Sequence, residues 1–552
     1  MQMKKIAAAL AVICLTATTA QAGEREDMEL VRQTTNNLIE ALVDSGVLTR
    51  AAADELIKKA QKKAAASVAA MKAEDGKTVR VTYVPESVRA EIREQVKQEV
   101  IAQAKSERWG DPGALPEWMD RIQWEGDVRV RYQTDRYAKN NSLLGDYQND
   151  FFRPGATRFP DAVGDNVNLL PSYNLTENRS RWRVRARLGV LAKLTPMVSA
   201  GVRLTTGNTT DRVSTNQTLG QNFNKYTAVF DRAYLRLDPA EWLSVSAGRI
   251  PNPWFGSDLV WDEDLNFEGM AVSLKGGNAP GATFSPYMTF GAFPLREDNP
   301  PSNKNRWLYG IQTGVQWDLS STTRSKFGVA LYDFRDIAGR QRSDDDLTFI
   351  SGAGEPAAPN YRSYEYPSNL RQKGNTLFAT NAPSENANNA SIWGLASKFR
   401  VLNLTASVDV ANWEPVHLIL TGDYAKNLAF DKNDILKRTG LNVTDSKARN
   451  AGWQVKATLG MPRIRELNDW QVSFAYRYLG SDAVLDAFTD SDYNLGGTNH
   501  KGYVFSAAYG IDRRTSLGLR WMSFDSISTT TFSTANGRFG TDTLQVDLTA
   551  SF

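Results

Sequence analysis

From about residue 121 to the last residue, apolar and polar side chains alternate in segments of about ten residues. The clearest segment is the last one, in which every second residue is apolar: Leu544, Val546, Leu548, Ala550 and Phe552. The residues between them are polar, so one face can meet lipid and the other water. Beyond the first twenty-odd residues, no run approaches the roughly 18 apolar residues of a membrane-spanning helix. The pattern predicts an all-β fold, a transmembrane antiparallel β-barrel.

The number of alternating segments predicts about 16 strands, within a range of 14 to 18. An even number is what single-chain bacterial barrels have. The segments are predicted to start near Gln123, Arg181, Met197, Tyr226, Trp242, Glu268, Thr283, Trp307, Lys326, Trp393, Glu414, Trp453, Trp470, Gly502, Thr515 and Leu544.

The connections between these segments are alternately long and short, as in barrels with outer loops and periplasmic turns. If the N-terminal part is periplasmic, the predicted outer loops are 138–177, 207–225, 251–267, 292–305, 336–390, 427–450, 480–500 and 525–540. The connections between them are brief, such as 194–196 and 512–513. A miscounted strand would break this alternation, so it supports the count independently.

Tryptophans gather at the predicted strand ends, which favours a membrane barrel over the alternative of a soluble secreted β protein. Those expected at the inner ends are Trp124, Trp242, Trp317, Trp413 and Trp470. Those expected near the outer ends are Trp182, Trp307, Trp393, Trp453 and Trp521. Two aromatic belts suit the two interfaces of a membrane.

The first 22 residues have the features of a secretory signal peptide. Lys4 and Lys5 precede an apolar run, and Ala20-Gln21-Ala22 is a small-x-small cleavage site. Cleavage would remove both lysines and no acid, so the formal charge would fall from +3 to +1, which gives no case for nucleic acid. It would also remove Cys14, the only cysteine, and with it any disulfide or thiol chemistry.

Residues 23–118 are rich in Ala, Glu, Lys, Arg and Gln, with apolar residues at helical spacing. The seam Met28, Val31, Thr35, Leu38 and Leu42 suits a partner helix but covers too few heptads to separate a helical packing domain from an oligomerising coiled coil. The domains are therefore predicted as signal peptide 1–22, helical or coiled-coil periplasmic domain 23–118, and outer-membrane barrel 119–552.

Two stretches carry a resemblance to a known family. The first comprises residues 83–86 (YVPE), 107–118 (ERWGDPGALPEW) and 124–127 (WEGD), and the second comprises 248–254 (GRIPNPW) and 258–264 (DLVWDED). They resemble the putative porin family of Gram-negative bacteria. The resemblance implies an outer-membrane pore and a homotrimer, without naming a solute. The terminal Phe552 is similar to the signal by which barrel-insertion machinery recognises its substrates.

Parity assigns a net basic set of side chains to the barrel interior. The predicted pore-lining residues are Arg129, Arg131, Arg181, Arg183, Arg185, Arg187 and Arg203. The wall of any water-filled lumen needs charged residues for hydration, so these arginines alone do not identify a transported solute.

The third outer loop carries four acids among apolar residues: Asp258, Asp262, Glu263 and Asp264. Apolar residues on an outer loop suggest that it folds inward as a constriction loop, with its acids facing the early arginines. The alternative is an exposed loop tip, or a surface that binds cations. The inward arrangement predicts passive diffusion of small hydrophilic solutes with weak anion preference.

Catalysis is not expected, because neither His417 nor His500 has an evident set of partners, although Asp490 and Asp492 could mimic a His-Asp pair with His500. The calcium-like run from Asp490 to Asn494 lacks the turn glycine and the bidentate Glu, and Asp344-Asp345-Asp346 is read as a solvated tip. No cofactor or resident metal is predicted. The alternative function is an outer-membrane anchor or adhesin whose helical arm tethers the membrane to peptidoglycan.

Overall fold

A computed structural model of the chain describes Lys58 and residues 121–141, 177–277, 283–297, 304–343, 364–367, 369–381, 393–440, 442–443, 449–528 and 538–552. The chain divides into two units, Met1–Ala114 and Leu115–Phe552. Apart from Lys58, which is helical, the predicted signal peptide and helical domain lie outside the described residues.

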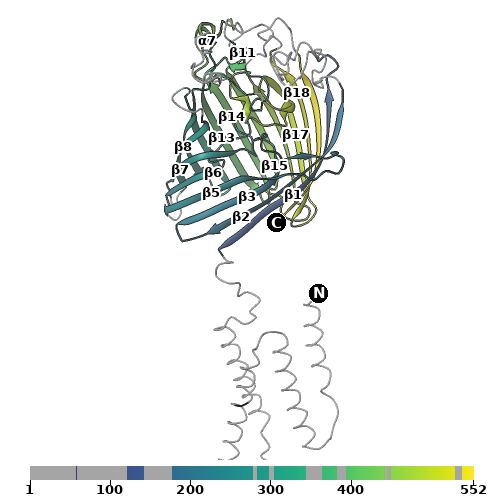
Figure 1. The fold of residues 1–552 in the computed structure, drawn as a ribbon. Coiled ribbons are helices and arrows are strands. Elements are labelled where there is room, and N and C mark those ends of the chain that lie inside the picture. The colour runs from purple at the N-terminus through teal and green to yellow at the C-terminus, as the bar shows by residue number, and fades with distance from the viewer. Residues whose placement is uncertain are drawn as a thin grey trace, which may run out of the picture. The chain divides into compact units, whose positions relative to one another are not determined.

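Sixteen strands of the described residues form one closed antiparallel sheet, which confirms the predicted barrel and its strand number (Figure 1). They are β1 (Ile122–Tyr137), β2 (Arg179–Lys193), β3 (Val198–Thr206), β5 (Ala228–Ala240), β6 (Leu243–Pro251), β7 (Asn266–Lys275), β8 (Phe284–Arg296), β9 (Arg306–Asp318), β10 (Thr323–Arg335), β13 (Phe399–Trp413), β14 (Val416–Asn427), β15 (Ala451–Gly460), β16 (Trp470–Leu479), β17 (His500–Gly510), β18 (Thr515–Ser526) and β19 (Gly540–Ser551).

The barrel closes where the first strand pairs with the last. Val128 lies opposite Ala550, and Phe552 exchanges backbone hydrogen bonds with Gly126 at 3.0 and 3.1 Å. Closure leaves no open sheet edge, which is the condition for strands to cross a membrane. The short strand β4 (Gln217–Thr218) pairs with β2. Among the described residues, no helix is long and apolar enough to span a membrane.

Short turns lie at one end of the barrel and long connections at the other, as predicted (Figure 1). The long-connection end carries α7 (Lys432–Thr439) and a separate two-stranded sheet of β11 (Leu377–Ala379) and β12 (Trp393–Leu395). The strand predicted to start at Trp393 was misplaced, because β13 starts at Phe399. Trp393 instead lies in β12 and packs against the buried apolar cluster, so it does not belong to an aromatic belt.

Side chains of opposite parity face opposite sides of the sheet. On β1, Val128 is 44% exposed on the outer face while Arg131, on the inner face, is 3% exposed. Tryptophans on the exposed face mark both strand ends: Trp124, Trp242, Trp317 and Trp413 at the short-turn end, and Trp182 and Trp453 at the other. Trp521 lies midway along β18 rather than near its outer end. This distribution matches the apolar band with aromatic girdles of an outer-membrane barrel.

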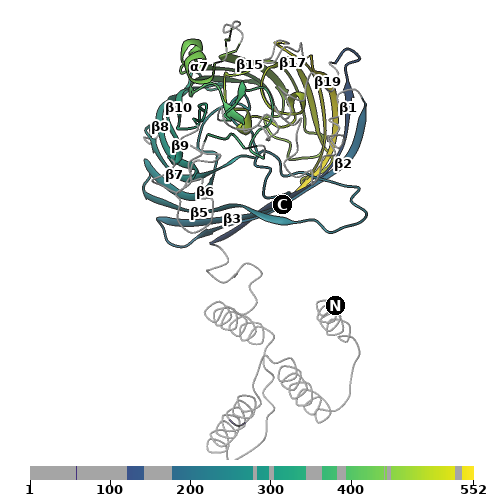
Figure 2. The same cartoon turned by 45° about the horizontal axis from the view of Figure 1, so that its top comes forward.

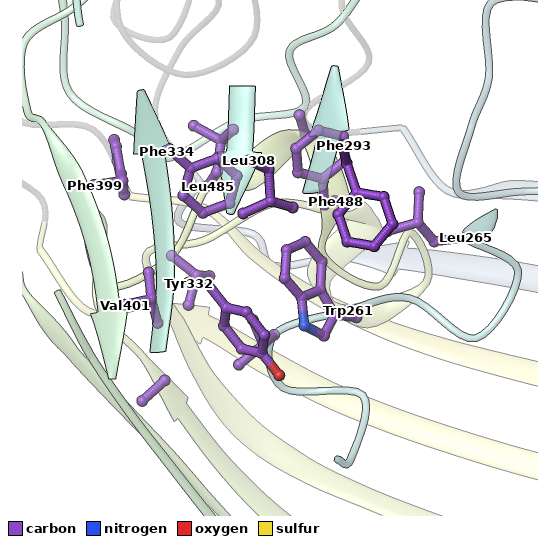
Figure 3. Close-up of a cluster of buried hydrophobic side chains, with 14 of the residues drawn as sticks. Trp261, Leu265, Phe293, Leu308, Tyr332, Phe334, Phe399, Val401, Leu485 and Phe488 are labelled. Carbon is purple, nitrogen blue, oxygen red and sulfur yellow. The ribbon is translucent and has the colours of Figure 1, made fainter. Parts of the chain in front are cut away.

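The main apolar core lies inside the barrel, where segments from the long-connection end pack against the wall (Figures 2 and 3). Trp261 contacts Phe267 and Tyr332 edge-on, with ring centroids 5.0 Å apart in each pair. Phe334 of β10 stacks on Phe488 at 6.2 Å. Apolar side chains from strands β7 to β13 thus hold inserted segments against one sector of the inner wall.

Gly502 of β17 is predicted to tolerate no side chain. An alanine Cβ there would collide with the Ser523 carbonyl oxygen and lie 2.8 Å from the Phe524 Cα, so the backbone of β18 would have to shift. Gly502→Ala should lower the free energy of unfolding by about 1–3 kcal/mol, measured by thermal melting of the detergent-solubilised barrel. Gly422→Ala of β14 is the control, because its Cβ would meet nothing within 4 Å. Equal melting of the two variants would contradict the packing.

Candidate functional site: the barrel lumen

Six arginines form two adjacent rows on the inner wall, one on β1 and one on β2. We call them the arginine ladder: Arg129, Arg131, Arg181, Arg183, Arg185 and Arg187. Register explains their arrangement, because Arg129 lies directly opposite Arg185, and Arg131 opposite Arg183. Cross-strand partners share one face of a sheet. Arg203 continues the same surface on β3, where it lies opposite Gly189.

Wall carboxylates compensate much of this positive charge. Asp127 pairs with Arg185 at 2.8 Å and Arg187 at 2.5 Å. Arg131 pairs with Asp547 of β19 at 2.7 Å. Like-charged guanidiniums at these spacings would otherwise repel one another strongly in a partly buried setting.

Two further pairs complete the compensation. A register shift between β3 and β5, which strand parity does not reveal, puts Asp231 2.5 Å from Arg203. Asp135, which is fully buried and has the same parity as Arg131, lies 3.0 Å from Arg181. The least engaged member of the ladder is Arg183, whose nearest carboxylate oxygen, on Asp492, is 4.0 Å away.

The segment 252–265 between β6 and β7 crosses the lumen. The Phe255 backbone N–H donates to Gln312 of β9 at 2.8 Å, and the Ser257 hydroxyl donates to Asp423 of β14 at 2.7 Å. Farther along the segment, Asp264 lies 3.2 Å from Arg187 of β2. These strands belong to different sectors of the ring, so a segment that contacts all of them passes through its interior (Figure 2).

The four acids of this segment have different environments. Asp264 meets the ladder at Arg187, whereas Asp258 pairs with Arg477 of β16 at 2.8 Å, on another part of the wall. Asp262 is buried and accepts from the backbone N–H of Ser491 at 3.1 Å. Burial and the nearby carboxyls of Asp490 and Asp264 raise the pKa of Asp262. Glu263 is exposed.

A second inserted segment, residues 480–499 between β16 and β17, was not identified from the sequence. Asp492 lies 3.0 Å from Arg131 and 3.4 Å from Arg520 of β18. The Tyr493 hydroxyl donates to Asp258 at 2.5 Å, and its ring lies 3.8 Å from the Arg477 guanidinium carbon. The available signal was an apolar run at 483–485 followed by Phe488, the same kind of signal that singled out 251–267.

The inserted segments leave cavities along the lumen. One of about 740 Å³ lies between residues 251–256 and strands β6 to β10, and includes Ser246, Ser273, Thr289, Gln312 and Lys326 in its lining. Two smaller cavities, of about 350 and 370 Å³, adjoin residues 205–215, and the second is lined by Arg181 and Arg183 of the ladder. Hydroxyl, amide and charged side chains of this kind favour water and polar solutes.

The histidines have no common site. His417 bonds through Nδ1 to Asp409 at 2.7 Å. His500 is fully buried, and Asp490 and Asp492, its suggested partners, instead lie near arginines. The described residues contain no group of three or more His, Cys, Asp or Glu that could hold a metal ion, and 344–346 lie outside them.

Comparisons with known proteins give one family. A family model described as putative porin matches residues 32–552. No curated protein matches the chain. Among solved structures, the chain is similar to OprB of Pseudomonas putida at high pH, with 12% identity, a TM-score of 0.42, and coverage of 80% of this chain and 96% of that one.

Two other solved structures are 11% identical to the chain. One is OmpF of Salmonella typhi in complex with daunomycin, with a TM-score of 0.38 and coverage of 78% of this chain and 97% of that one. The other is an anion-selective porin from Comamonas acidovorans, with a TM-score of 0.36 and coverage of 78% and 99%.

Asp258 is predicted to fasten the 252–265 segment to the wall. Arg477 is fully buried, so Asp258→Ala would leave its charge without a carboxylate partner, next to the Gln454 amide and the Tyr493 ring. Breaking a buried pair costs about 3–5 kcal/mol, and about 2 kcal/mol is expected here because Asp258 keeps a quarter of its side chain exposed. Melting in detergent measures the loss. Asp238→Ala, which breaks the more exposed pair with Arg236, is the control and should change little. Equal effects would contradict this role.

Asp486 is predicted to make the packing of the 480–499 segment depend on pH. Burial raises the pKa of Asp486 to about 6, although the Tyr366 hydroxyl donates to it. A raised carboxyl pKa adds stability at low pH that is lost as the pH rises from about 4 through about 6. Asp486→Asn should therefore flatten this part of the melting-temperature profile. Glu263→Gln, at an exposed position, should not. Identical profiles for all three proteins would contradict the prediction.

Proposed function

The chain belongs to the putative porin family, and on that premise we propose that it forms an outer-membrane pore for passive diffusion of small hydrophilic solutes, with weak anion preference. The observation that carries the proposal is the 252–265 segment, which crosses a closed barrel beside polar cavities. A segment in that position would narrow the path of a solute through the lumen. Asp264 and the ladder would put charges of both signs beside a narrow, wet passage.

The balance of interior charge supports a weak preference rather than a strong one. Nine guanidiniums take part in the lumen network: the ladder, Arg203, Arg477 and Arg520. Among the residues that the structure describes, eight carboxylates lie within ion-pair distance of them: Asp127, Asp135, Asp231, Asp258, Asp264, Asp490, Asp492 and Asp547. The small positive excess would attract anions modestly, and salt would screen it.

The remaining parts of the proposal concern the surroundings of the barrel. The N-terminal helical domain would lie in the periplasm after removal of the signal peptide, and the pores would assemble as homotrimers in outer-membrane lipid. Phe552, whose backbone closes the barrel against Gly126, would be the residue read by the insertion machinery. Binding of the helical domain to peptidoglycan is compatible with transport. We propose a channel without catalytic activity.

Asp262→Asn/Asp264→Asn is predicted to strengthen anion preference, because it removes the acid that faces Arg187. Single-channel conductance and reversal potential under a salt gradient measure the change in a planar bilayer. Wild-type protein should give stable steps with a slightly anion-shifted reversal potential, and the variant a larger shift. Glu466→Gln, at an exposed turn paired with Arg513, is the control.

Two outcomes of this measurement would count against the proposal. Unchanged conductance and selectivity in the double variant would exclude a constriction role for the 252–265 segment. Silence of the wild-type protein, also after deletion of residues 23–118, would exclude an open pore and favour the anchor or adhesin.

A further inference from the structure

Three cavities adjoin one another around Arg212, in the segment between β3 and β4. Their volumes are about 190, 350 and 370 Å³, and Arg212 lines all three. Arg249, Asn266 and Glu268 line both of the first two. The guanidinium of Arg212 therefore lies where the cavity of 190 Å³, which is largely apolar, meets the two polar cavities.

The smallest of the three cavities is apolar on one side. Its lining includes six large apolar side chains, from the inserted segments and from the wall: Trp261, Leu265, Phe267, Phe293, Leu485 and Phe488. Several of them are drawn in Figure 3, where Phe293, Phe488 and Leu265 lie close together. An apolar cavity of about 150 Å³ is known to take up benzene, so 190 Å³ is enough for one six-membered ring.

We call the charged side chains in the lining of the same cavity its basic rim. Its charged lining consists of Arg212, Arg249, Arg296, Arg306 and one acid, Glu268, which pairs with Arg249. Arg212 donates to the backbone carbonyls of Asn369 at 3.3 Å and Leu370 at 3.1 Å. Among the residues that the structure describes, Arg212 forms no ion pair. Its guanidinium has five N–H donors in a planar fork that matches a carboxylate.

We propose that this cavity binds small monocarboxylates that carry one apolar ring, with the ring among Trp261, Phe293 and Phe488 and the carboxylate on Arg212. The combination of an apolar space and a basic rim selects the class. A neutral ring would leave the charge of Arg212 unmatched, and a small inorganic anion would leave the apolar space unfilled. The proposal rests on the proposed pore, to which it adds a preferred class of solute.

Isothermal titration calorimetry on the full chain in detergent measures the binding of benzoate, acetate and benzamide. Comparing these three compounds separates the contribution of the apolar space from that of Arg212. Benzoate should bind at least about tenfold more tightly than acetate, which lacks the ring, and than benzamide, which lacks the charge. Arg212→Gln should weaken benzoate binding by a similar factor. Leu370→Glu, which places an acid on the lining beside Arg212, should do the same. Arg324→Gln, at an exposed pair near the short turns, should not.

Calorimetry tests whether the cavity binds benzoate, and this test does not depend on whether the protein conducts ions. Benzoate binding equal to that of acetate, or unchanged by both Arg212→Gln and Leu370→Glu, would overturn the site while leaving the pore proposal intact. Ring-dependent and Arg212-dependent binding in a protein that is silent in bilayers would support the site and overturn the pore. In a conducting protein, benzoate added to the bilayer should interrupt the current more often than acetate, and Arg212→Gln should abolish the difference.

Discussion

Compensation of charge inside a closed barrel is the constraint on which the rest of this structure depends. A barrel that faces lipid outside must turn its polar side chains inward. In this chain, two neighbouring strands turn six arginines toward the same interior. Wall acids such as Asp127 and Asp547 neutralise part of that charge, and carboxylates from two inserted segments, Asp264 and Asp492, reach further members of the ladder.

This constraint divides the lumen into two sectors. Around β1, β2, β18 and β19, ion pairs hold the inserted segments, and the space between them stays polar. Around β7 to β13, aromatic and aliphatic side chains hold the same segments by apolar contact. The 252–265 segment uses both kinds of contact, since Asp264 meets the charged sector and Trp261 the apolar one. Two independent kinds of anchor fix one segment across the passage.

The sequence was sufficient for the parts of the fold that follow from strand periodicity. Alternation along residues 181–192 puts the arginines on one face because β-strands have a fixed period of two. Alternation does not predict the orientation of Asp231, because a register shift between β3 and β5 determines which face this bulge residue occupies. Trp393 was assigned to a wall strand because alternation cannot distinguish a wall strand from a short strand in a loop. In the 480–499 segment, the apolar run at 483–485 indicates inward packing, but its partners, such as Trp261 and Arg131, are distant residues that no local pattern identifies.

The position of the 252–265 segment across the lumen can be tested with an introduced disulfide. The chain contains no cysteine besides Cys14, so introduced pairs can be read without interference. Ser257→Cys/Asp423→Cys joins two side chains whose oxygens lie 2.7 Å apart, and Ser257→Cys/Thr549→Cys is the control, on the β19 wall. We expect mild oxidation to cross-link the first pair within one chain and not the second, seen as a shift in denaturing gels. Free thiols in the first pair, with the barrel folded, would show that the segment does not cross the lumen.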